Sequence, residues 1–594
     1  MTQIQSASQR QVPLLGAHAD TNGTTFRAWT TQADAVDVVL FDRDQNELER
    51  RSLRRVADGL FEGTFEDVKE GALYKFALGG DAWPDPYARW MPYGVHGPAE
   101  VWAPSYEFKH DHPKVRREEL VIYELHVGTF TAEGTYAAAT EKLSYLAHLG
   151  VNCLELLPLS AFPGRWGWGY DGVAHFAPFK EYGSPEDLMR LIDEAHGLGL
   201  VVLLDMVYNH FGPSGNYLPV YSDRYFTARH KTPWGDALDY TNPYLRALVT
   251  DSAQHWLKTY RFDGFRLDAT QSIQDDSQYH ILQELADKVH ALGGSHFLFC
   301  EDYRNLPDLV TQFHMDGIWA DDFHHQVRVC LTGEQDGHFR CYAPKVDELA
   351  RGIAEGWLYY GQCEWPLEPG FIRGKPADEL EASNLIYFVQ NHDQIGNRAF
   401  GDRLQETAGE DGFLAASMLL LFLPTVPLLF QGQEWMASTR FAFFSDHEGE
   451  LGHAVSTGRL EEFGHFEAFQ KPELRAQIPD PQDETTFHSS KLDWDEANDG
   501  VHAKTLGLYR ELLRLRREDP VLTHRSRRDL AAGTEGDVLW VRRWNDDQQR
   551  VLLVNFGHEE VEIPARFRDL SPVAATHEGS GLAARSATIL VGAR

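Results

Sequence analysis

The middle of the chain repeats one pattern, in which a short apolar run is followed by a longer amphipathic stretch. Stretches such as 185–198 and 245–260 carry apolar residues at helical spacing, and the short runs between them are typical of buried parallel strands. There are eight such runs, enough for a TIM (β/α)8 barrel, and no shorter α/β sheet would use them all. The predicted strands are 121–125, 153–157, 201–204, 264–267, 297–300, 317–320, 386–389 and 426–430.

Both flanks of the predicted barrel have a different pattern, with short alternating stretches broken by Gly, Asp and Pro. Examples are 36–41 and 73–78 before the barrel and 538–541 and 550–554 after it; such stretches are typical of small β-sandwiches. The length of 594 residues also exceeds what one core normally holds. We therefore predict three domains: an N-terminal β-sandwich (1–112), the barrel (113–520) and a C-terminal β domain (521–594).

The formal net charge of −34 limits the partners of the chain. Phosphate-rich surfaces would repel it, so we expect neither nucleic acid nor a membrane, and a neutral ligand such as a sugar is more natural. The polar N-terminus, 1–11, has no apolar signal core, and no stretch approaches the ~18 apolar residues of a membrane span. The five cysteines are scattered without a CxxC pair, which indicates reduced core thiols. We expect a cytoplasmic monomer.

Four acids follow apolar runs of the predicted barrel: Asp205, Asp268, Glu301 and Asp393. The carboxyl ends of barrel strands meet at one face, so Asp268, Glu301 and Asp393 are expected to converge on one pocket. A single acid in such a place is most simply explained by a salt bridge or a cap. Several acids converging on one pocket are what glycoside hydrolysis requires.

Arg266 lies two residues before Asp268, so on a strand both side chains point to the same side. A guanidinium there would keep Asp268 ionised, as a nucleophile needs. Glu301 ends an apolar run, where burial would raise its pKa, as a general acid needs. We count Arg266 and Asp205 among the residues around a bound substrate.

These acid-bearing segments resemble, in order and spacing, the four signature regions of the α-amylase superfamily of glycoside hydrolases. The segments are Asp205–His210, Gly264–Asp268, Glu301 and Asn391–Gln394. The resemblance implies a retaining mechanism, in which Asp268 attacks the anomeric carbon and Glu301 is first acid and then base. It implies that Asp393 grips the distorted sugar, that His210 and His392 donate hydrogen bonds to its hydroxyls, and that the N-terminal sandwich is carbohydrate-binding-like.

Aromatic residues alternate with glycines in Trp166–Asp171, after the second predicted strand. Glycines contribute no side chain to a core, so exposed faces that stack on pyranose rings are the favoured interpretation for Trp166, Trp168 and Tyr170. Tyr170 matches the platform that the superfamily places under the reacting sugar. Asp171 either helps to orient the pocket or caps a turn.

Other segments indicate which family of the superfamily the chain resembles. Ordinary amylases have a Lys-His pair shortly after the nucleophile, whereas Ala269–Ser272 stands here. Segments 121–130, 230–236, 321–325 and 391–398 resemble the malto-oligosyltrehalose trehalohydrolase family over essentially the whole chain. This implies hydrolysis of the α-1,4 bond next to the trehalose end of maltooligosyltrehalose, which releases trehalose.

A site that recognises the trehalose end needs polar groups beyond Glu301, on the leaving-group side. The candidates are Asp322, His324, His325 and Gln394, because buried polar groups that would otherwise stay unpaired discriminate best between hydroxyl patterns. The alternative is that they only hold the catalytic acids in place.

The loop after the third predicted strand (210–243) is long and includes Trp234; loops of this length are usually functional or disordered. We count Trp234 among the substrate-binding residues. Related amylases use the residue equivalent to Asn209 as a calcium ligand, but the sequence has no carboxylate-rich calcium loop. We predict no metal and no cofactor.

Two alternatives remain. A glucan-branching or debranching enzyme would use the same catalytic acids, and branching enzymes share the N-terminal sandwich and a strand like 121–130. A non-catalytic carbohydrate-binding protein could keep the fold, but would not need all three acids.

Overall fold

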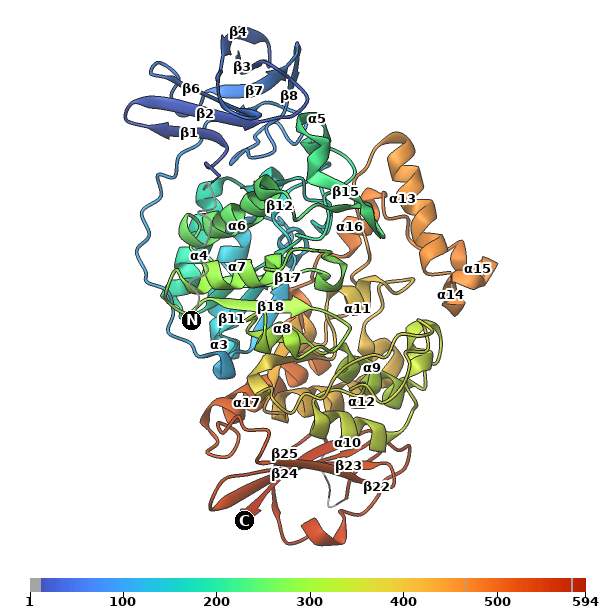
Figure 1. Cartoon of the computed structure of the whole chain (residues 1–594). Helices are drawn as coiled ribbons and strands as arrows, with labels where there is room; N and C mark the ends of the chain where they lie inside the picture. Colours follow the sequence, from blue (N-terminus) through green and yellow to red (C-terminus); the bar gives the residue numbers. More distant parts are fainter. Residues whose placement is uncertain (1–11, 465, 578, 580) are drawn as a thin grey trace, which may run out of the picture.

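The computed structural model of the chain describes residues 12–464, 466–577, 579 and 581–594. The stretch 1–11, in which we predicted no signal segment, lies outside the described residues. Figure 1 shows an elongated molecule, with β-sheets at its two ends and the barrel between them.

The barrel is closed by eight parallel strands, in the order β10-β11-β14-β17-β18-β19-β20-β21. The predicted fold and all eight predicted strands are confirmed. The strands are β10 (Ile122–Leu125), β11 (Cys153–Leu156), β14 (Val201–Met206), β17 (Gly264–Leu267), β18 (Phe297–Glu301), β19 (Gly317–Trp319), β20 (Leu385–Phe388) and β21 (Val426–Phe430).

Apolar side chains fill the barrel interior because alternate residues of each strand point inward. Ile122, Leu203, Phe299 and Ile386 belong to one buried cluster there. At the carboxyl ends the inward positions become polar, and these positions build the site described below.

Helices surround the strands, and their sequences explain where they begin. In α4, Ser184 accepts a hydrogen bond from the backbone N–H of Asp187, the Asp187 carboxylate accepts one from Ser184 N, and Pro185 occupies the first turn. The helices up to β21 are α1 (Val127–Phe130), α2 (Tyr136–Thr140), α3 (Leu143–Leu149), α4 (Pro185–Gly197), α5 (Leu218–Tyr221), α6 (Pro243–Lys258), α7 (Ile281–His290), α8 (Asp308–Thr311), α9 (Asp321–Thr332), α10 (Val346–Glu355), α11 (His392–Gly396) and α12 (Leu404–Phe422).

The N-terminal part is a sandwich of two antiparallel sheets, ordered β1-β2-β6-β5 and β4-β3-β7-β8, with β9 beside β7. Phe26 of one sheet packs on Tyr74 of the other, with ring centroids 5.1 Å apart. The strands are β1 (Gly16–Asp20), β2 (Gly23–Trp29), β3 (Val36–Phe41), β4 (Glu47–Ser52), β5 (Arg54–Ala57), β6 (Leu60–Phe65), β7 (Leu73–Leu78), β8 (Asp81–Trp83) and β9 (Ala99–Glu100).

The loop 210–243 is largely structured and joins the sandwich to the barrel. It contains α5 and a hairpin of β15 (Phe226–Thr232) and β16 (Gly235–Leu238). Thr31 N donates to the carbonyl of Tyr221 over 3.0 Å, and Trp29 stacks on Tyr244, which follows the loop, at 4.2 Å. A second small sheet, β12 (Ser160–Ala161) and β13 (Ala174–Pro178), lies between β11 and α4.

A helical segment follows β21 and projects from the side of the barrel (Figure 1, orange). We call α13 (Gly449–Glu462), α14 (Glu467–Gln470) and α15 (Pro472–Arg475) the helical arm. Then α16 (Glu484–Ser489) and the long α17 (Gly500–Glu518) lead to the C-terminal sheet.

The C-terminal sheet has the order β22-β23-β24-β26-β25. Arg543 of β23 is buried and donates to the carbonyl of Phe422 at 2.5 Å, while Arg516 of α17 donates to that of Leu421 at 3.0 Å. These arginines satisfy carbonyls at the end of α12, which otherwise have no helical partner. The strands are β22 (Leu530–Glu535), β23 (Val538–Trp544), β24 (Gln548–Asn555), β25 (Ser571–Ala575) and β26 (Ala587–Ala593).

The predicted domain boundaries fall between β9 and β10 and between α17 and β22, and they remain predictions. Within the described part of the chain, no helix has the length and apolar character needed to cross a membrane. All five cysteines are free, as predicted, but only Cys153 and Cys300 are core thiols; Cys330 and Cys341 are partly exposed and Cys363 is exposed.

Candidate active site

One buried guanidinium holds three of the predicted acids together at the carboxyl end of the barrel. Arg266 Nη1 donates to both carboxyl oxygens of Asp205, at 2.8 and 2.7 Å, and to Asp268 Oδ1 at 2.9 Å. Its Nη2 donates to Glu301 Oε2 at 2.9 Å. The convergence of Asp268 and Glu301 on one site therefore follows from their shared partner.

Further contacts fix the orientation of Asp268. Asn209 Nδ2 donates to Asp268 Oδ2 at 2.7 Å and to its backbone carbonyl at 2.8 Å. Asn209 thus orients the Asp268 side chain. The next residue, Ala269, has a φ of 40°, a strained value for a residue with a Cβ. This conformation aims its N–H at Glu301 Oε2, 2.8 Å away.

Burial raises the pKa values of two of these acids. Burial raises the pKa of Glu301 well above its ordinary value; Arg266 opposes this shift, whereas the charges of Asp268 and Asp393 add to it. Burial likewise raises the pKa of Asp205 to about 6, against the effect of Arg266. Glu301 is therefore suited to hold a proton near neutral pH.

His392 links the acids to an aromatic platform. Its Nε2 lies 2.7 Å from the Tyr170 hydroxyl and 3.4 Å from Asp393 Oδ2, and Tyr170 donates to Asp205 Oδ2 at 2.5 Å. Burial disfavours the charged ring, but the carboxylates of Asp393 and Glu124 outweigh this and raise the pKa of His392 to about 9. The ring is fully buried, so it supports Tyr170 and Asp393 and does not itself face the pocket, contrary to our expectation.

The exposed aromatic surface predicted for Trp166 and Trp168 is wrong. Trp168 is 4% exposed, stacks on Phe441 at 5.3 Å, and donates its indole N–H to the carbonyl of Ala442. Trp166 is also buried, against Phe487. Of the three aromatics, Tyr170 alone stays partly exposed beside the acids.

Three other predicted residues, His210, Trp234 and Asp171, are not among those that line the cavity described next. His210 bonds Asn209 and stacks under Trp234, with ring centroids 4.1 Å apart and planes 2° apart. Trp234 is 48% exposed. Asp171 accepts from His447 Nε2 at 3.1 Å, which favours an orienting role over a turn cap.

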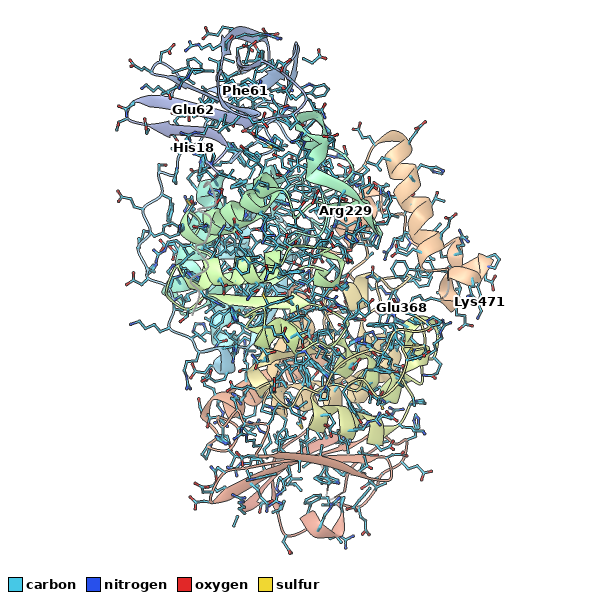
Figure 2. All side chains as sticks on the ribbon, in the orientation of Figure 1. His18, Phe61, Glu62, Arg229, Glu368 and Lys471 are labelled. Carbon is cyan, nitrogen blue, oxygen red and sulfur yellow. The ribbon has the colours of Figure 1, made fainter. Side chains whose placement is uncertain are left out.

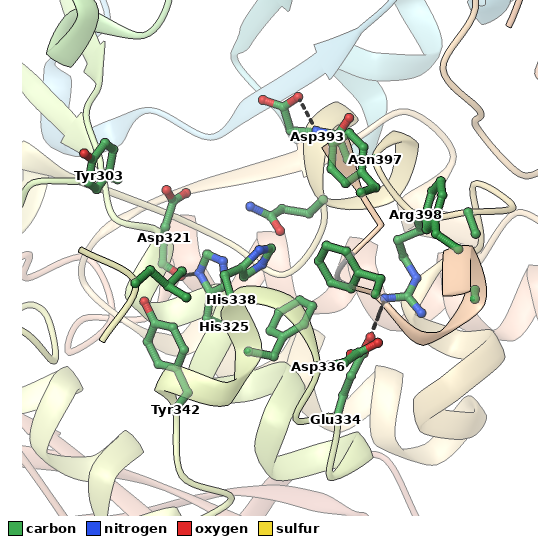
Figure 3. Close-up of a pocket in the computed structure, with 18 of the residues that line it drawn as sticks. Tyr303, Asp321, His325, Glu334, Asp336, His338, Tyr342, Asp393, Asn397 and Arg398 are labelled. Carbon is green, nitrogen blue, oxygen red and sulfur yellow. Dashed lines mark hydrogen bonds and ion pairs between the residues drawn. The ribbon is translucent and has the colours of Figure 1, made fainter. Parts of the chain in front are cut away.

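A cavity of about 460 Å³ opens beside Glu301 and Asp393. Figure 3 shows Asp321 and His325 on one side of it and Asp393, Asn397 and Arg398 on the other. Its polar lining includes Glu301, Tyr303, Asp321, His325, Glu334, Tyr342, Arg373, Asp393, Gln394, Asn397 and Arg398.

The outer wall of the cavity is apolar and comes from two separate segments. Phe469 of α14, with Phe463 and Phe466 from the connection between α13 and α14, forms one part, and Trp365 and Leu367 form another. In Figure 2, Glu368 and Lys471, which neighbour these two parts, lie on the same side of the molecule.

The structure divides the predicted leaving-group residues. His325 and Gln394 line the cavity. Asp322 does not, because it is 1% exposed and its carboxylate bonds Asn305, Tyr342, Leu358 N and Tyr359 N and pairs with Arg373. His324 is buried and stacks on Phe388. Both predictions of substrate contact are therefore corrected to internal packing and hydrogen bonding.

Asp321, which we did not predict, takes the place of Asp322. It lines the cavity, and burial raises its pKa to about 7 despite the opposing charge of Arg373. The motif 321–325 therefore identified the correct segment, but we chose the wrong one of its two carboxylates.

Among the described residues, the group with the spacing of metal ligands is His112, His196 and Asp263. It lies at the other end of the barrel, before β17. His112 and His196 bond the Asp263 carboxylate at 2.6 and 3.0 Å. We therefore interpret the group as hydrogen bonds that attach the segment before β10 to the barrel.

Two family descriptions match the chain. The alpha amylase catalytic domain matches residues 107–229, and carbohydrate-binding module 48, the isoamylase N-terminal domain, matches residues 14–89. The second match lies on the N-terminal sandwich.

Similarity to individual proteins extends over most of the chain. The malto-oligosyltrehalose trehalohydrolase of Deinococcus radiodurans is 52% identical over 558 residues, 91% of this chain and 90% of that protein. The one of Rhizobium sp. is 40% identical over 561 residues, 91% and 92% of the two chains. A solved structure of a Salmonella typhimurium protein, described as an alpha amylase, has a TM-score of 0.89 at 35% identity and covers 98% of this chain and 99% of its own.

A glucan branching enzyme is a more distant relative. That of Cutibacterium acnes is 31% identical over 452 residues, 70% of this chain and 67% of the enzyme. The higher identities extend over about nine tenths of both proteins. The chain therefore belongs to the malto-oligosyltrehalose trehalohydrolase family of glycoside hydrolases, within the alpha-amylase superfamily.

Proposed function

We propose that the chain hydrolyses the α-1,4 bond next to the trehalose end of maltooligosyltrehalose, with retention at the anomeric carbon, and releases trehalose. The observation that carries the retaining part is the shared guanidinium. Asp268 and Glu301 each bond Arg266 at 2.9 Å, which favours the short carboxyl separation of a retaining pair, about 5 to 6 Å, over the wider spacing of an inverting pair.

In the first step, an Asp268 carboxylate oxygen bonds to the anomeric carbon while the bond to the leaving oxygen breaks. The proton of Glu301 goes to that oxygen, and trehalose leaves. In the second step, Glu301 takes a proton from water, the resulting hydroxide attacks the anomeric carbon, and the bond to Asp268 breaks. Burial raises the pKa of Glu301, which suits its role as the first proton donor.

Asp393 and Tyr170 are the proposed contacts of the reacting sugar. Both are held by His392, so their positions relative to Asp268 are set before substrate binds. A partly exposed tyrosine ring offers apolar area to a pyranose face, and a carboxylate binds hydroxyls strongly.

The cavity beyond Glu301 is the proposed site of the trehalose unit. Its volume of about 460 Å³ lies in the range of small-molecule sites. Asp321, His325 and Gln394 supply hydrogen-bonding groups, and the aromatic wall of the helical arm supplies apolar surface. An α,α-1,1 linkage has no reducing hydroxyl, so a maltose end would leave some of these groups unpaired.

The test is to incubate the purified chain with maltooligosyltrehalose and, in parallel, with plain maltooligosaccharide, and to separate the products by chromatography. We expect free trehalose from the first substrate and much slower cleavage of the second. NMR immediately after mixing should show the new reducing end as the α-anomer. Glucan products of higher branching in place of trehalose would identify a branching enzyme.

Free cysteines support a reducing compartment such as the cytoplasm, and we include that location in the proposal. The expected monomer stays a prediction.

A further inference from the structure

Glu124 is a buried carboxylate that touches neither the cavity nor the acids around Arg266. It lies on β10, is fully buried, and directs both carboxyl oxygens at one residue. Oε2 accepts the backbone N–H of His392 at 2.9 Å, and Oε1 lies 2.5 Å from its Nδ1. An ion buried this deeply is costly unless its partner is charged and well placed.

The hydrogen bonds around His392 indicate where its protons are. Nδ1 faces the Glu124 carboxylate, which only accepts, so Nδ1 carries a proton. Nε2 faces Asp393, which also only accepts, and the Tyr170 oxygen, whose own proton is directed to Asp205 at 2.5 Å. A proton on Nε2 satisfies both neighbours, and with both nitrogens protonated the ring is an imidazolium.

The alternative is a neutral His392 that accepts from Tyr170, with the proton on Asp205. Arg266 Nη1 donates to both oxygens of Asp205, at 2.8 and 2.7 Å, which favours the ionised form of Asp205. The doubly protonated ring agrees with the complete set of contacts.

We propose that Glu124 is a positioning residue of the hydrolytic site and acts through His392. Its carboxylate fixes the imidazolium, whose Nε2–H holds the Tyr170 ring and the Asp393 carboxylate beside the acids on Arg266. The inference rests on the proposed roles of Asp393 and Tyr170, but not on which end of the glucan is recognised.

His392 is surrounded by titratable and charged groups from several elements. These are Glu124, His126, Glu155, Tyr170, Asp205, Arg266 and Asp393. Within this set, Glu124 makes two direct contacts with His392 through its carboxylate. Removing the charge of Glu124 should therefore lower the pKa of the His392 imidazolium.

Glu155 provides a matched control. It is the register partner of Glu124 on the adjacent strand β11 and is equally buried, yet neither of its carboxyl oxygens bonds any described residue. Burial raises its pKa well above the usual range, which favours the protonated form, and Gln is close in shape to a protonated Glu.

The experiment compares Glu124→Gln and Glu155→Gln on whichever glucan the wild-type protein cleaves fastest. We expect Glu124→Gln to lower kcat on the order of 10- to 100-fold with KM within about twofold, because a misplaced contact acts mainly on the transition state. The basic limb of its kcat profile should also begin at a lower pH than that of the wild type. Glu155→Gln should stay within about twofold of wild type in both parameters.

A double-mutant cycle separates action through His392 from general damage. In a His392→Asn background, Glu124→Gln should cause no further loss of kcat. An undiminished loss there, a wild-type kcat in Glu124→Gln alone, or an equal loss in Glu155→Gln would overturn the proposal. If Glu124→Gln does not fold, Glu124→Asp keeps the charge, and it should lower kcat without moving the basic limb; a moved limb would contradict the inference.

The readout is independent of the trehalose assignment. If the wild type cleaves plain maltooligosaccharide as fast as maltooligosyltrehalose, the proposed substrate fails, while the comparison of Glu124 with Glu155 on that substrate is unaffected.

Discussion

Glu301 accepts a hydrogen bond of 2.9 Å from Arg266, yet burial raises its pKa well above the ordinary value. The hydrogen bond and the raised pKa are compatible because three carboxylates share the single positive charge of Arg266. Asp205 and Asp268 both bond Nη1, and Glu301 alone bonds Nη2. One of the three acids is therefore best neutral, and Glu301 is the one that faces the cavity, where a proton can be passed to a leaving group.

Replacing Asp268 with Asn should abolish nearly all turnover, because an amide cannot form the covalent intermediate. We expect a loss of roughly 10⁴-fold in kcat, with the circular dichroism spectrum and cooperative thermal unfolding preserved. Asn209→Ala is a useful comparison, since it removes the contacts that orient Asp268 and should cost much less. Substantial turnover by Asp268→Asn would exclude it as the nucleophile.

The activity of the wild type should follow a bell-shaped pH profile. Turnover falls in acid when the nucleophile is protonated, and it falls in base when Glu301 loses its proton. Since burial raises the pKa of Glu301, the basic limb should lie above the range of an ordinary carboxylic acid. Glu301→Gln should have low activity and lose the basic limb that reports Glu301, so that the only remaining fall in base is the one near pH 9, where His392 loses a proton; a basic limb unchanged from the wild type would mean that another group is the acid.

The sequence was sufficient to predict the barrel and its acids. Each strand is a run of apolar residues, and Asp268 and Glu301 follow their runs directly, so strand period and chain order alone place them at one face. The same reasoning found Arg266, because residues two apart on a strand share a side.

The remaining errors have physical causes. Trp168 is buried by Phe441 and Ala442, which are remote in sequence, and no local pattern reveals such a contact. In the motif 321–325 the chain changes from strand to helix at Asp321. The direction of each side chain therefore depends on the residue at which α9 begins, which sequence patterns locate only within a few residues.

Tyr170 should contribute through both its ring and its hydroxyl, and two variants distinguish them. Tyr170→Ala should cost on the order of 1 to 3 kcal/mol of transition-state binding through lost apolar contact. Tyr170→Phe keeps the ring but removes the bonds to Asp205 and His392, so its cost should be smaller and should appear mainly in kcat. The measurement is kcat/KM on maltooligosyltrehalose, and unchanged values for both variants would leave Tyr170 as packing only.

Asp321 and Asp322 are adjacent in sequence, yet they should give opposite results when substituted. Asp322 bonds two side chains and two backbone N–H groups and pairs with buried Arg373. Breaking such a pair costs about 3 to 5 kcal/mol, so Asp322→Asn should lower the free energy of unfolding strongly.

Asp321 faces the cavity, as does Gln394. Asp321→Asn and Gln394→Ala should leave the melting temperature nearly unchanged, but reduce kcat/KM on maltooligosyltrehalose far more than on plain maltooligosaccharide. The reason is that each removes a group that pairs with the leaving disaccharide, and the preference between the two substrates is the difference of those interactions. Thermal unfolding and kinetics on both substrates check this. Equal losses on the two substrates would show that Asp321 and Gln394 serve only the acids, and the source of specificity would then be sought at Trp234 and the hairpin that carries it.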